Sequence, residues 1–98
     1  MPDIPAIGEV LAALDDPVRL EMVRRLANAG RPVQCKLLYE GISKSTASHH
    51  FAVLREAGVT ESVSVDGSIH QRLLDDELER DLPGVVGSIV AAANEVSN

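Results

Sequence analysis

The sequence predicts a mainly α-helical α+β fold with one small β-hairpin, built as a single domain over residues 1–98. Aliphatic residues recur at helical spacing near both ends and in the middle of the chain. After Gly58 the spacing changes to a period of two, and Asp66-Gly67 follows as a two-residue hairpin turn. Aromatic residues make up only 2% of the chain, so the core has to be aliphatic, which suits packed helices.

Two helices are expected before residue 31. The first is predicted over residues 7–14, where four aliphatic side chains share one face: Ile7, Val10, Leu11 and Leu14. Asp16 and Pro17 are typical of a helix start, because aspartate caps free backbone amides and proline fits the first helical turn. The second helix therefore begins at Pro17 and ends near Gly30. Its two sides differ in residue type, with Val18, Met22 and Leu26 facing inward and Arg19, Arg24 and Arg25 largely outward.

Residues 33–58 predict a helix-turn-helix. A short segment begins after Pro32 and ends at the tight turn Glu40-Gly41-Ile42, where glycine supplies a conformation that a Cβ would resist. The next helix has marked ends, since Ser43 is a good N-cap and Gly58 a good C-terminal cap. Two helices joined by a short turn that contains glycine are typical of this motif.

The helix after Ser43 has two unlike faces. Ala47, Phe51 and Leu54 form an apolar stripe. The opposite face has short hydroxyl side chains, an imidazole and positive charge, with no acid until Glu56: Ser45, Ser48, His49, Ala52 and Arg55. Such a surface can lie close to base edges and phosphates, because nothing long or negative keeps it away. The alternative is an ordinary amphipathic surface helix, although such faces usually carry Glu and Lys.

Residues 59–74 predict a β-hairpin directly after this helix. Val59 to Val65 alternates as a half-buried strand, and Ser68 to Leu74 makes the return strand. The return strand places Ile69, Gln71 and Leu73 on one face and His70 and Arg72 on the other. A hairpin in this place is a wing, whose tip can reach backbone phosphate or the minor groove.

The last part of the chain predicts a short acidic helix, a break at Pro83-Gly84 and a final helix over residues 85–97. The helices at 7–14 and 85–97 are not needed to close a three-helix core with a hairpin. We expect them to pair across a two-fold axis, because an unpaired apolar stripe would be an exposed patch. The predicted interface residues are Ile7, Val10, Leu11, Leu14, Val86, Ile89, Val90 and Ala93. The alternative is that both stripes pack on their own domain.

The net charge of −6 argues against a nucleic-acid partner only as an average over the whole chain. Residues 31–55 carry four cations against Glu40 alone, whereas residues 75–98 carry Arg80 against six acids. Electrostatic contact depends on the local surface, because salt screens distant charges. The central segment is therefore the one suited to nucleic acid.

Composition also restricts the compartment and the chemistry. A single cysteine, Cys35, excludes an intrachain disulfide and fits a reducing compartment. Residues 1–5 lack the pattern of a secretory signal, and the longest uncharged run, over residues 82–94, is too short to span a bilayer. We expect a cytoplasmic protein without a membrane partner. A thiol enzyme that uses Cys35 finds no support, since the chain offers no oxyanion site or glycine-rich phosphate loop, and no enzyme is predicted.

Two motifs resemble those of the ArsR family of bacterial winged-helix repressors. Residues 11–20 read LAALDDPVRL, similar to the opening motif of the family. Residues 43–51 and 53–59 read SKSTASHHF and VLREAGV, similar to its recognition helix, and the Asp66-Gly67 hairpin matches its wing. The resemblance covers residues 7–74, with a compatible C-terminal helix.

The resemblance implies a homodimer that represses by occupying a palindromic double-stranded DNA operator and is released when an effector binds. By position, it places five residues near the major groove: Lys44, Ser45, Thr46, Ser48 and His49. His70, Gln71 and Arg72 would lie on the wing, and Arg55 joins the predicted DNA-binding set. His50 is interpreted as a partly buried structural residue, because it sits beside the apolar stripe.

No metal or cofactor is predicted, although many members of the family sense metals. Their Cys-x-Cys site near the start of the third helix has one counterpart here, Cys35. Another site of the family uses His and carboxylate ligands on the last helix of both subunits, but residues 85–98 contain no histidine and only Glu95. A closed zinc site needs about four ligands. The effector stays open, a small molecule or a thiol-reactive compound. A second function stays open as well: a winged helix that binds proteins without binding DNA, favoured by the overall acidity and the scarcity of arginine on the recognition helix.

Overall fold

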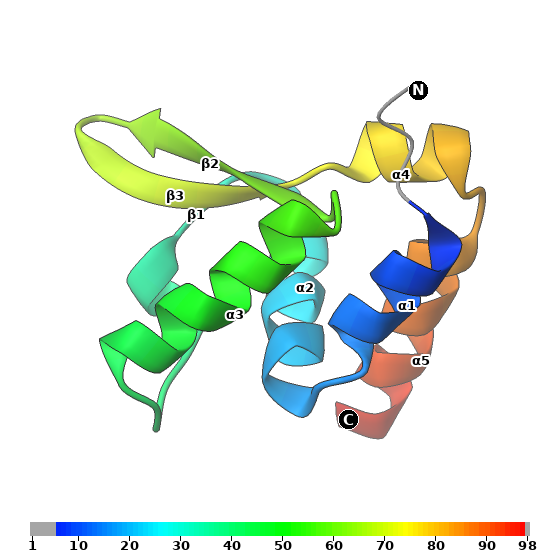
Figure 1. Ribbon diagram of the computed structural model, residues 1–98, viewed down its shortest axis with the longest axis horizontal. Helices are drawn as coiled ribbons and strands as arrows, with labels where there is room; N and C mark the ends of the chain where they lie inside the picture. The colour runs from blue at the N-terminus through cyan, green and yellow to red at the C-terminus, as the bar shows by residue number, and fades with distance from the viewer. Residues whose placement is uncertain (1–5, 98) are drawn as a thin grey trace.

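The computed structural model describes residues 6–97, so the segment at 1–5 in which no signal pattern was found lies outside the described residues. The helices are α1 (Ile7–Leu14), α2 (Pro17–Ala29), α3 (Lys44–Glu56), α4 (Asp75–Asp81) and α5 (Val85–Ser97). The strands are β1 (Val33–Gln34), β2 (Thr60–Val65) and β3 (Ser68–Leu73), and a 3₁₀ turn, η1, spans Cys35–Leu37. Figure 1 shows α2 in the middle, with α3 on one side and α1 and α5 together on the other. This is a winged helix-turn-helix, as the sequence predicts.

The helix starts follow the predicted capping chemistry. Asp16 Oδ2 accepts hydrogen bonds from the backbone amides of Val18 and Arg19, at 2.9 and 3.0 Å, and so begins α2. Ser43 Oγ accepts from the amide of Thr46 at 3.1 Å and begins α3. A side-chain acceptor at this position satisfies an amide that the helix leaves without a partner.

The sheet is antiparallel and three-stranded, in the order β1-β3-β2. The predicted hairpin is confirmed, with Val65 opposite Ser68 and positive φ angles at both turn residues, 50° at Asp66 and 81° at Gly67. Positive φ at both positions matches the twist of the flanking strands and favours the Asp-Gly pair. Figure 1 shows the hairpin projecting away from α1 and α5, as a wing.

Two details between α2 and α3 differ from the prediction. The sequence did not predict β1, because two residues are too few to show a strand period. The first helix of the predicted helix-turn-helix is only the single 3₁₀ turn η1. Val33 and Gln34 pair with β3, and of the residues between them and Gly41 only Cys35–Leu37 form a helical turn.

The core is aliphatic and receives side chains from every helix. Phe51 is its one buried aromatic residue among those described, and Tyr39 packs edge-to-face against it with ring centroids 6.1 Å apart. The largest side chains removed from water are Met22, Leu26, Leu38, Leu54, Gln71, Val10, Val23 and Val59. Burying a Leu, Val or Met side chain stabilises the fold by about 1.5–3 kcal/mol. The apolar stripe of α3 is thus the surface that packs this helix against the domain.

Half of the predicted dimer-interface residues belong to the core of their own subunit. Val10 and Leu14 of α1 and Val86 and Val90 of α5 are buried without a partner chain. The apolar stripe of an amphipathic helix is wide enough that one edge packs against the core of its own subunit while the other edge stays exposed. For these four residues the alternative of packing on their own domain is correct, and their assignment to a dimer interface is wrong.

Candidate nucleic-acid interface

The outer face of α3 gathers six of the predicted DNA-binding residues on one exposed surface. The buried stripe of Ala47, Phe51 and Leu54 turns the opposite side of the helix outward. The six exposed side chains are Lys44, Ser45, Thr46, Ser48, His49 and Arg55. We call this surface the α3 outer face. It offers hydroxyl, imidazole and cationic groups over its whole length, with no carboxylate before Glu56.

The N-terminus of α3 is organised by Ser43. Its hydroxyl donates to Thr46 Oγ1 at 2.9 Å while it accepts from the Thr46 amide, and it lies 3.2 Å from Ser45 Oγ. This network holds the hydroxyls of the first turn in fixed positions. The positive end of the helix dipole and the ammonium group of Lys44 meet here, which favours a bound phosphate.

Three cations near α3 have no acidic partner among residues 6–97. In the part of the chain that the structure describes, no carboxylate forms an ion pair with Lys36, Lys44 or Arg55. Lys36 is exposed on η1 and was not among the predicted site residues. The sequence indicated Lys36 only through the excess of cations over acids in residues 31–55. These three side chains give the region around α3 its free positive charge.

Two arginines of α2 are paired with acids. Glu21 accepts from Arg24 at 2.7 Å and from Arg25 at 2.8 Å, and Glu40 accepts from Arg25 at 2.6 Å. Hydrogen bonds from Arg24, reinforced by those from Arg25, lower the pKa of Glu21 to about 2. The carboxylates thus stay charged and hold the α2 arginines in place.

The wing differs from the prediction at Gln71, which is buried at 2% exposure rather than presented to a partner. Its position opposite Val33 of β1 and Ser62 of β2, in the central strand of the sheet, encloses the side chain. Gln71 is therefore removed from the DNA-binding set. The period-two pattern had placed it on the opposite face from His70 and Arg72, which was the available signal.

His70 and Arg72 lie on the wing with local partners. His70 Nδ1 is 3.1 Å from the carbonyl oxygen of Ser68. Arg72 donates to Glu61 at 2.7 Å and to Glu77 at 3.4 Å, and the hydrogen bond to Glu61 raises the pKa of Arg72. The charge of Arg72 is thus balanced at the base of the wing, next to α4.

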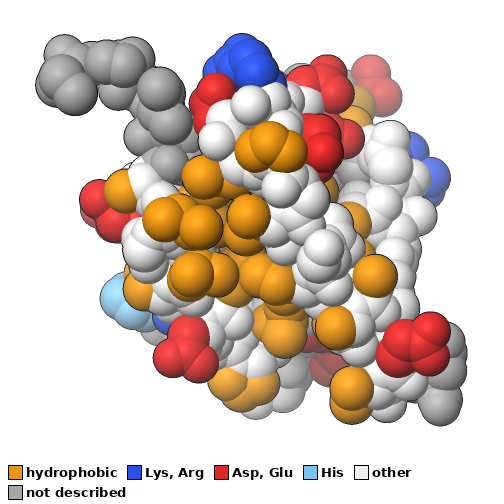
Figure 2. Space-filling view, turned by 90° about the vertical axis from the view of Figure 1, so that its right-hand side faces the viewer, with side chains coloured by type: hydrophobic (Ala, Val, Ile, Leu, Met, Phe, Trp, Pro, Cys, Tyr) orange, Lys and Arg blue, Asp and Glu red, His pale blue; other side chains and the backbone are white. Residues whose placement is uncertain are grey.

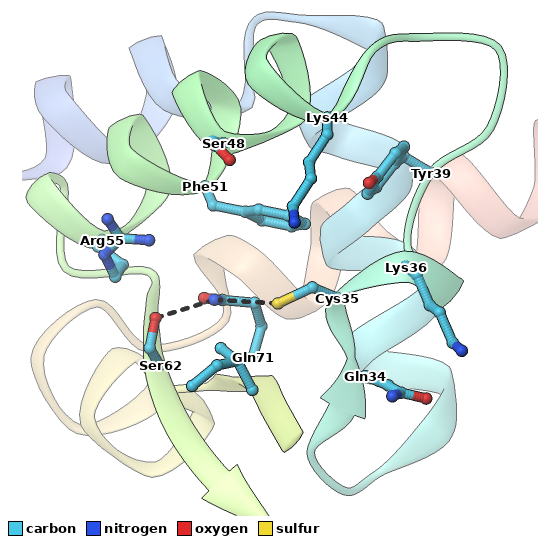
Figure 3. A pocket seen from close by; sticks show the side chains of 11 residues that line it. Gln34, Cys35, Lys36, Tyr39, Lys44, Ser48, Phe51, Arg55, Ser62 and Gln71 are labelled. Carbon is cyan, nitrogen blue, oxygen red and sulfur yellow. Dashed lines mark hydrogen bonds between the residues drawn. The ribbon is translucent and has the colours of Figure 1, made fainter. Parts of the chain in front are cut away.

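A cleft of about 430 Å³ lies beside the α3 outer face, between α3, η1 and the sheet. Figure 3 shows the amide of Gln71 between Ser62 and the thiol of Cys35, below the ring of Phe51. Lys44 and Arg55 extend from α3 over the same space. The cleft thus shares two cations with the surface that was predicted to bind DNA.

His50 has the structural role that the sequence predicts. Its side chain is 12% exposed, and Nδ1 lies 3.1 Å from Nη1 of Arg19 and 3.9 Å from Oδ2 of Asp16. Arg19 also donates to the carbonyl oxygen of Ala13 at 2.6 Å. The pKa of the Asp16 carboxyl is lowered, chiefly by the backbone hydrogen bond from Arg19. These contacts tie α3 to the corner between α1 and α2 and fix the angle of the α3 outer face.

A second surface, opposite the wing, is apolar. Figure 2 shows hydrophobic side chains gathered over α1 and α5, with acidic side chains around their edge. Ile7 and Leu11 of α1 are 51% and 44% exposed, and Val96 of α5 is 88% exposed. Ile89 and Ala93 of α5 are half-buried. These five residues are called the α1–α5 apolar face below.

Residues 6–97 contain no cluster of three or more His, Cys, Asp or Glu side chains arranged to hold a metal ion. No described helix combines the length and hydropathy that a membrane span requires.

Comparison with known sequences finds a matching domain family and curated relatives. The sequence profile of the helix-turn-helix domain matches residues 14–63. The HTH-type transcriptional regulator YceK of Bacillus subtilis (strain 168) is 34% identical over 84 residues, which is 84% of each chain.

Solved structures show the same architecture. The transcriptional repressor BigR from Xylella fastidiosa superposes with a TM-score of 0.68 at 26% identity, over 92% of this chain and 84% of that one. An ArsR-like transcriptional regulator from Rhodococcus sp. RHA1 gives 0.65 at 25% identity, over 92% and 85%. The helix-turn-helix match at residues 14–63 includes the α3 outer face.

Proposed function

Because the chain belongs to the helix-turn-helix domain family and is a transcriptional regulator of the ArsR type, we propose that it is a homodimeric repressor that reads a palindromic operator through α3. The α3 outer face supports this proposal most directly. It combines exposed hydroxyl groups with cations that form no ion pair among the described residues, and it has no carboxylate before Glu56. Hydroxyl groups match the chemistry of base edges, and cations match that of phosphates.

The residues divide between these two roles. Lys44 at the start of α3 and Arg55 at its end contact the phosphate backbone, and Lys36 adds a third cation from η1. Four shorter side chains face base edges in the major groove: Ser45, Thr46, Ser48 and His49. Single hydroxyl contacts discriminate less than a bidentate arginine–guanine pair. We therefore expect modest specificity per base and a contribution from DNA shape.

The wing has a smaller part in this proposal than the sequence predicted. His70 stays available at the hairpin, and Arg72 contacts the backbone only if it exchanges its carboxylate partners for phosphate. The wing tip has exposed Val65, Asp66 and Ile69 in place of cations. Residues 33–58 are thus the principal DNA-binding segment, and the wing at 59–74 positions the duplex.

A second copy of the chain covers the α1–α5 apolar face. Ile7 and Leu11 are large aliphatic side chains on a helix whose other edge is already buried, and Ile89 and Ala93 lie beside them on α5. A two-fold pair presents two α3 helices, which enter successive major grooves about 34–36 Å apart. A dimer of this kind is suited to a palindromic operator.

Repression follows from occupancy of the operator, and release follows when an effector weakens DNA binding. BigR, one of the similar structures, is a transcriptional repressor, which supports this direction of control. Acting on chromosomal DNA, the protein works in the cytoplasm. No cofactor is needed for binding of this kind.

The test begins with selection of bound duplexes from a random library, followed by fluorescence anisotropy with the enriched sequence at several salt concentrations. We expect a palindrome with half-sites one helical turn apart, and an affinity that falls steeply with salt because phosphate contacts release counterions. Sedimentation measures the dimer in the same buffer. An absence of enrichment, together with capture of a protein by the α3 outer face, would favour the protein-binding module instead.

A further inference from the structure

The cleft beside α3 has the dimensions of a small-molecule site. Its volume of about 430 Å³ lies within the range of pockets that hold small ligands. Phe51 and Tyr39 form an edge-to-face aromatic wall, and Ile69 adds an aliphatic side chain. Gln71, Ser62 and Cys35 form the polar floor that Figure 3 shows. A mostly apolar wall with a few polar groups is typical of a binding pocket.

The floor contains a buried acceptor without a donor. Gln71 Nε2 donates to Ser62 Oγ at 2.9 Å and lies 3.6 Å from Cys35 Sγ. Its other amide atom, Oε1, has no hydrogen-bond partner among the described residues, although the side chain is 2% exposed. Buried polar atoms are almost always paired in folded proteins. An O–H or N–H group of a ligand would supply the missing donor.

The charge around the cleft favours an anion. Three cations line it, Lys36, Lys44 and Arg55, and none of them forms an ion pair with a carboxylate among the described residues. No Asp or Glu is among the residues that line it. An anion placed here meets several positive charges and no repulsion.

We propose that this cleft binds a small aromatic carboxylate that carries a hydroxyl or amino donor, and that this ligand competes with DNA. The carboxylate pairs with Lys44 or Arg55, the ring lies against Phe51 and Tyr39, and the donor reaches Gln71 Oε1. The competition rests on the function proposed above, because Lys44, Ser48 and Arg55 belong both to the cleft and to the α3 outer face. Coupling of this kind is reciprocal, so bound DNA weakens the ligand to the same extent.

The first experiment measures ligand binding without DNA. 4-Hydroxybenzoate is the probe, benzoate lacks the donor, and methyl 4-hydroxybenzoate lacks the charge. Occupancy is read from the rate at which iodoacetamide alkylates Cys35, the only cysteine of the chain. We expect 4-hydroxybenzoate to slow alkylation, and both comparison compounds to bind roughly tenfold more weakly, since each loses one polar contact.

Two variants locate the contacts. Gln71→Met removes the acceptor and is expected to abolish the preference for 4-hydroxybenzoate over benzoate. Lys44→Ala, at an exposed position that does not endanger folding, is expected to weaken both carboxylates and to leave the methyl ester unchanged. Arg80→Ala removes a cation on α4, outside the cleft, and serves as the matched control.

The second experiment adds 4-hydroxybenzoate to the complex with the selected duplex and follows anisotropy. Displacement of the duplex at concentrations that protect Cys35 supports the inference. DNA binding with no protection by any of the three compounds overturns the inference and leaves the proposed function intact. Protection in a protein that binds no duplex supports the ligand site and overturns the proposed function. Protection without displacement overturns the competition.

Discussion

The two exposed faces of this small domain are built by helices of the same general pattern, yet they differ in what they offer. The α3 outer face has hydroxyls, an imidazole and the exposed cations Lys44 and Arg55. The α1–α5 apolar face has Ile7, Leu11 and Val96 exposed to water. Both sets of helices bury an apolar stripe in the same core. The periodicity of apolar residues thus indicates which side of a helix is buried. The residue types on the exposed side indicate what that side is suited to contact.

The two regions differ in which of their charges are paired, and the net charge of the chain does not show this difference. The chain carries a formal charge of −6, but Glu21 of α2, Glu61 of β2 and Glu77 of α4 form ion pairs with Arg24, Arg25 and Arg72. Lys44 and Arg55 form no such ion pair among the described residues. A paired arginine contributes little field at a distance, so the free cations define the surface that attracts an anion.

The largest effect is expected from breaking the buried side of α3. Leu54→Ala empties a position that is fully buried, and should lower the free energy of unfolding by about 3 kcal/mol through lost burial and the cavity left behind. His49→Ala, on the exposed side of the same helix, should change it by less than about 0.5 kcal/mol. Chemical denaturation of both variants measures the difference. Equal losses would show that the two sides of α3 are not distinct.

The apolar face is tested by placing a charge on it. Leu11→Glu puts a carboxylate into the proposed contact between two copies, and should convert the dimer to a monomer and weaken operator binding roughly a hundredfold, because the two half-sites are no longer bound together. Sedimentation and anisotropy measure the two effects.

Leu37→Glu is the matched control for the oligomeric state. Leu37 is also an exposed leucine, but it lies on η1, away from α1 and α5. A dimer that survives Leu11→Glu, or that is lost equally in both variants, would remove the proposed role of the α1–α5 apolar face.

Most of the fold could be predicted from the sequence because its signals are local. Asp16 and Ser43 act as caps where the sequence predicts them, and Asp66-Gly67 forms the hairpin turn. The strand β1 could not be predicted, since its two residues become a strand only through pairing with β3. The same cause limits η1, because the two residues that precede it, Val33 and Gln34, pair with the sheet.

The candidate site was predictable to a smaller degree, because burial depends on contacts that are distant in sequence. Gln71 was expected on the surface of the wing, but the central position of β3 encloses it. Val10 and Leu14 were expected between subunits, but one edge of the α1 stripe suffices for the core. The cleft joins η1, α3 and β3, and no short motif signals a cavity of that kind.

A smaller effect on DNA binding is expected from removing a single cation of the α3 outer face. Lys44→Ala should weaken DNA binding about tenfold and reduce the magnitude of the salt slope by about two, since a dimer loses one phosphate contact in each subunit. Arg80→Ala should change neither quantity, because Arg80 is engaged with Asp81 on α4. Anisotropy titrations across a salt series measure both variants. Equal effects would mean that net charge, rather than its position, controls binding.

The smallest effect concerns the paired cations of α2. The pKa of Glu21 is lowered to about 2 by hydrogen bonds from Arg24 and Arg25, from an ordinary value of 4.5. A carboxyl group with a lowered pKa in the folded state stabilises the protein above its unfolded pKa, and this contribution is lost as the pH falls from about 4.5 to about 2. Because the pair is partly exposed, we expect less than about 1 kcal/mol.

Glu21→Gln isolates this contribution from the other acids, which titrate in the same range. Thermal unfolding of the variant and the parent protein should differ near pH 6 and converge as the pH approaches 2. The substitution also releases Arg24 from its carboxylate at a position far along the chain from α3. If DNA affinity depends on cations at the α3 outer face, it should stay unchanged in this variant. A clear gain in affinity would mean that any released cation serves, and the distinction between the paired and unpaired groups would fail.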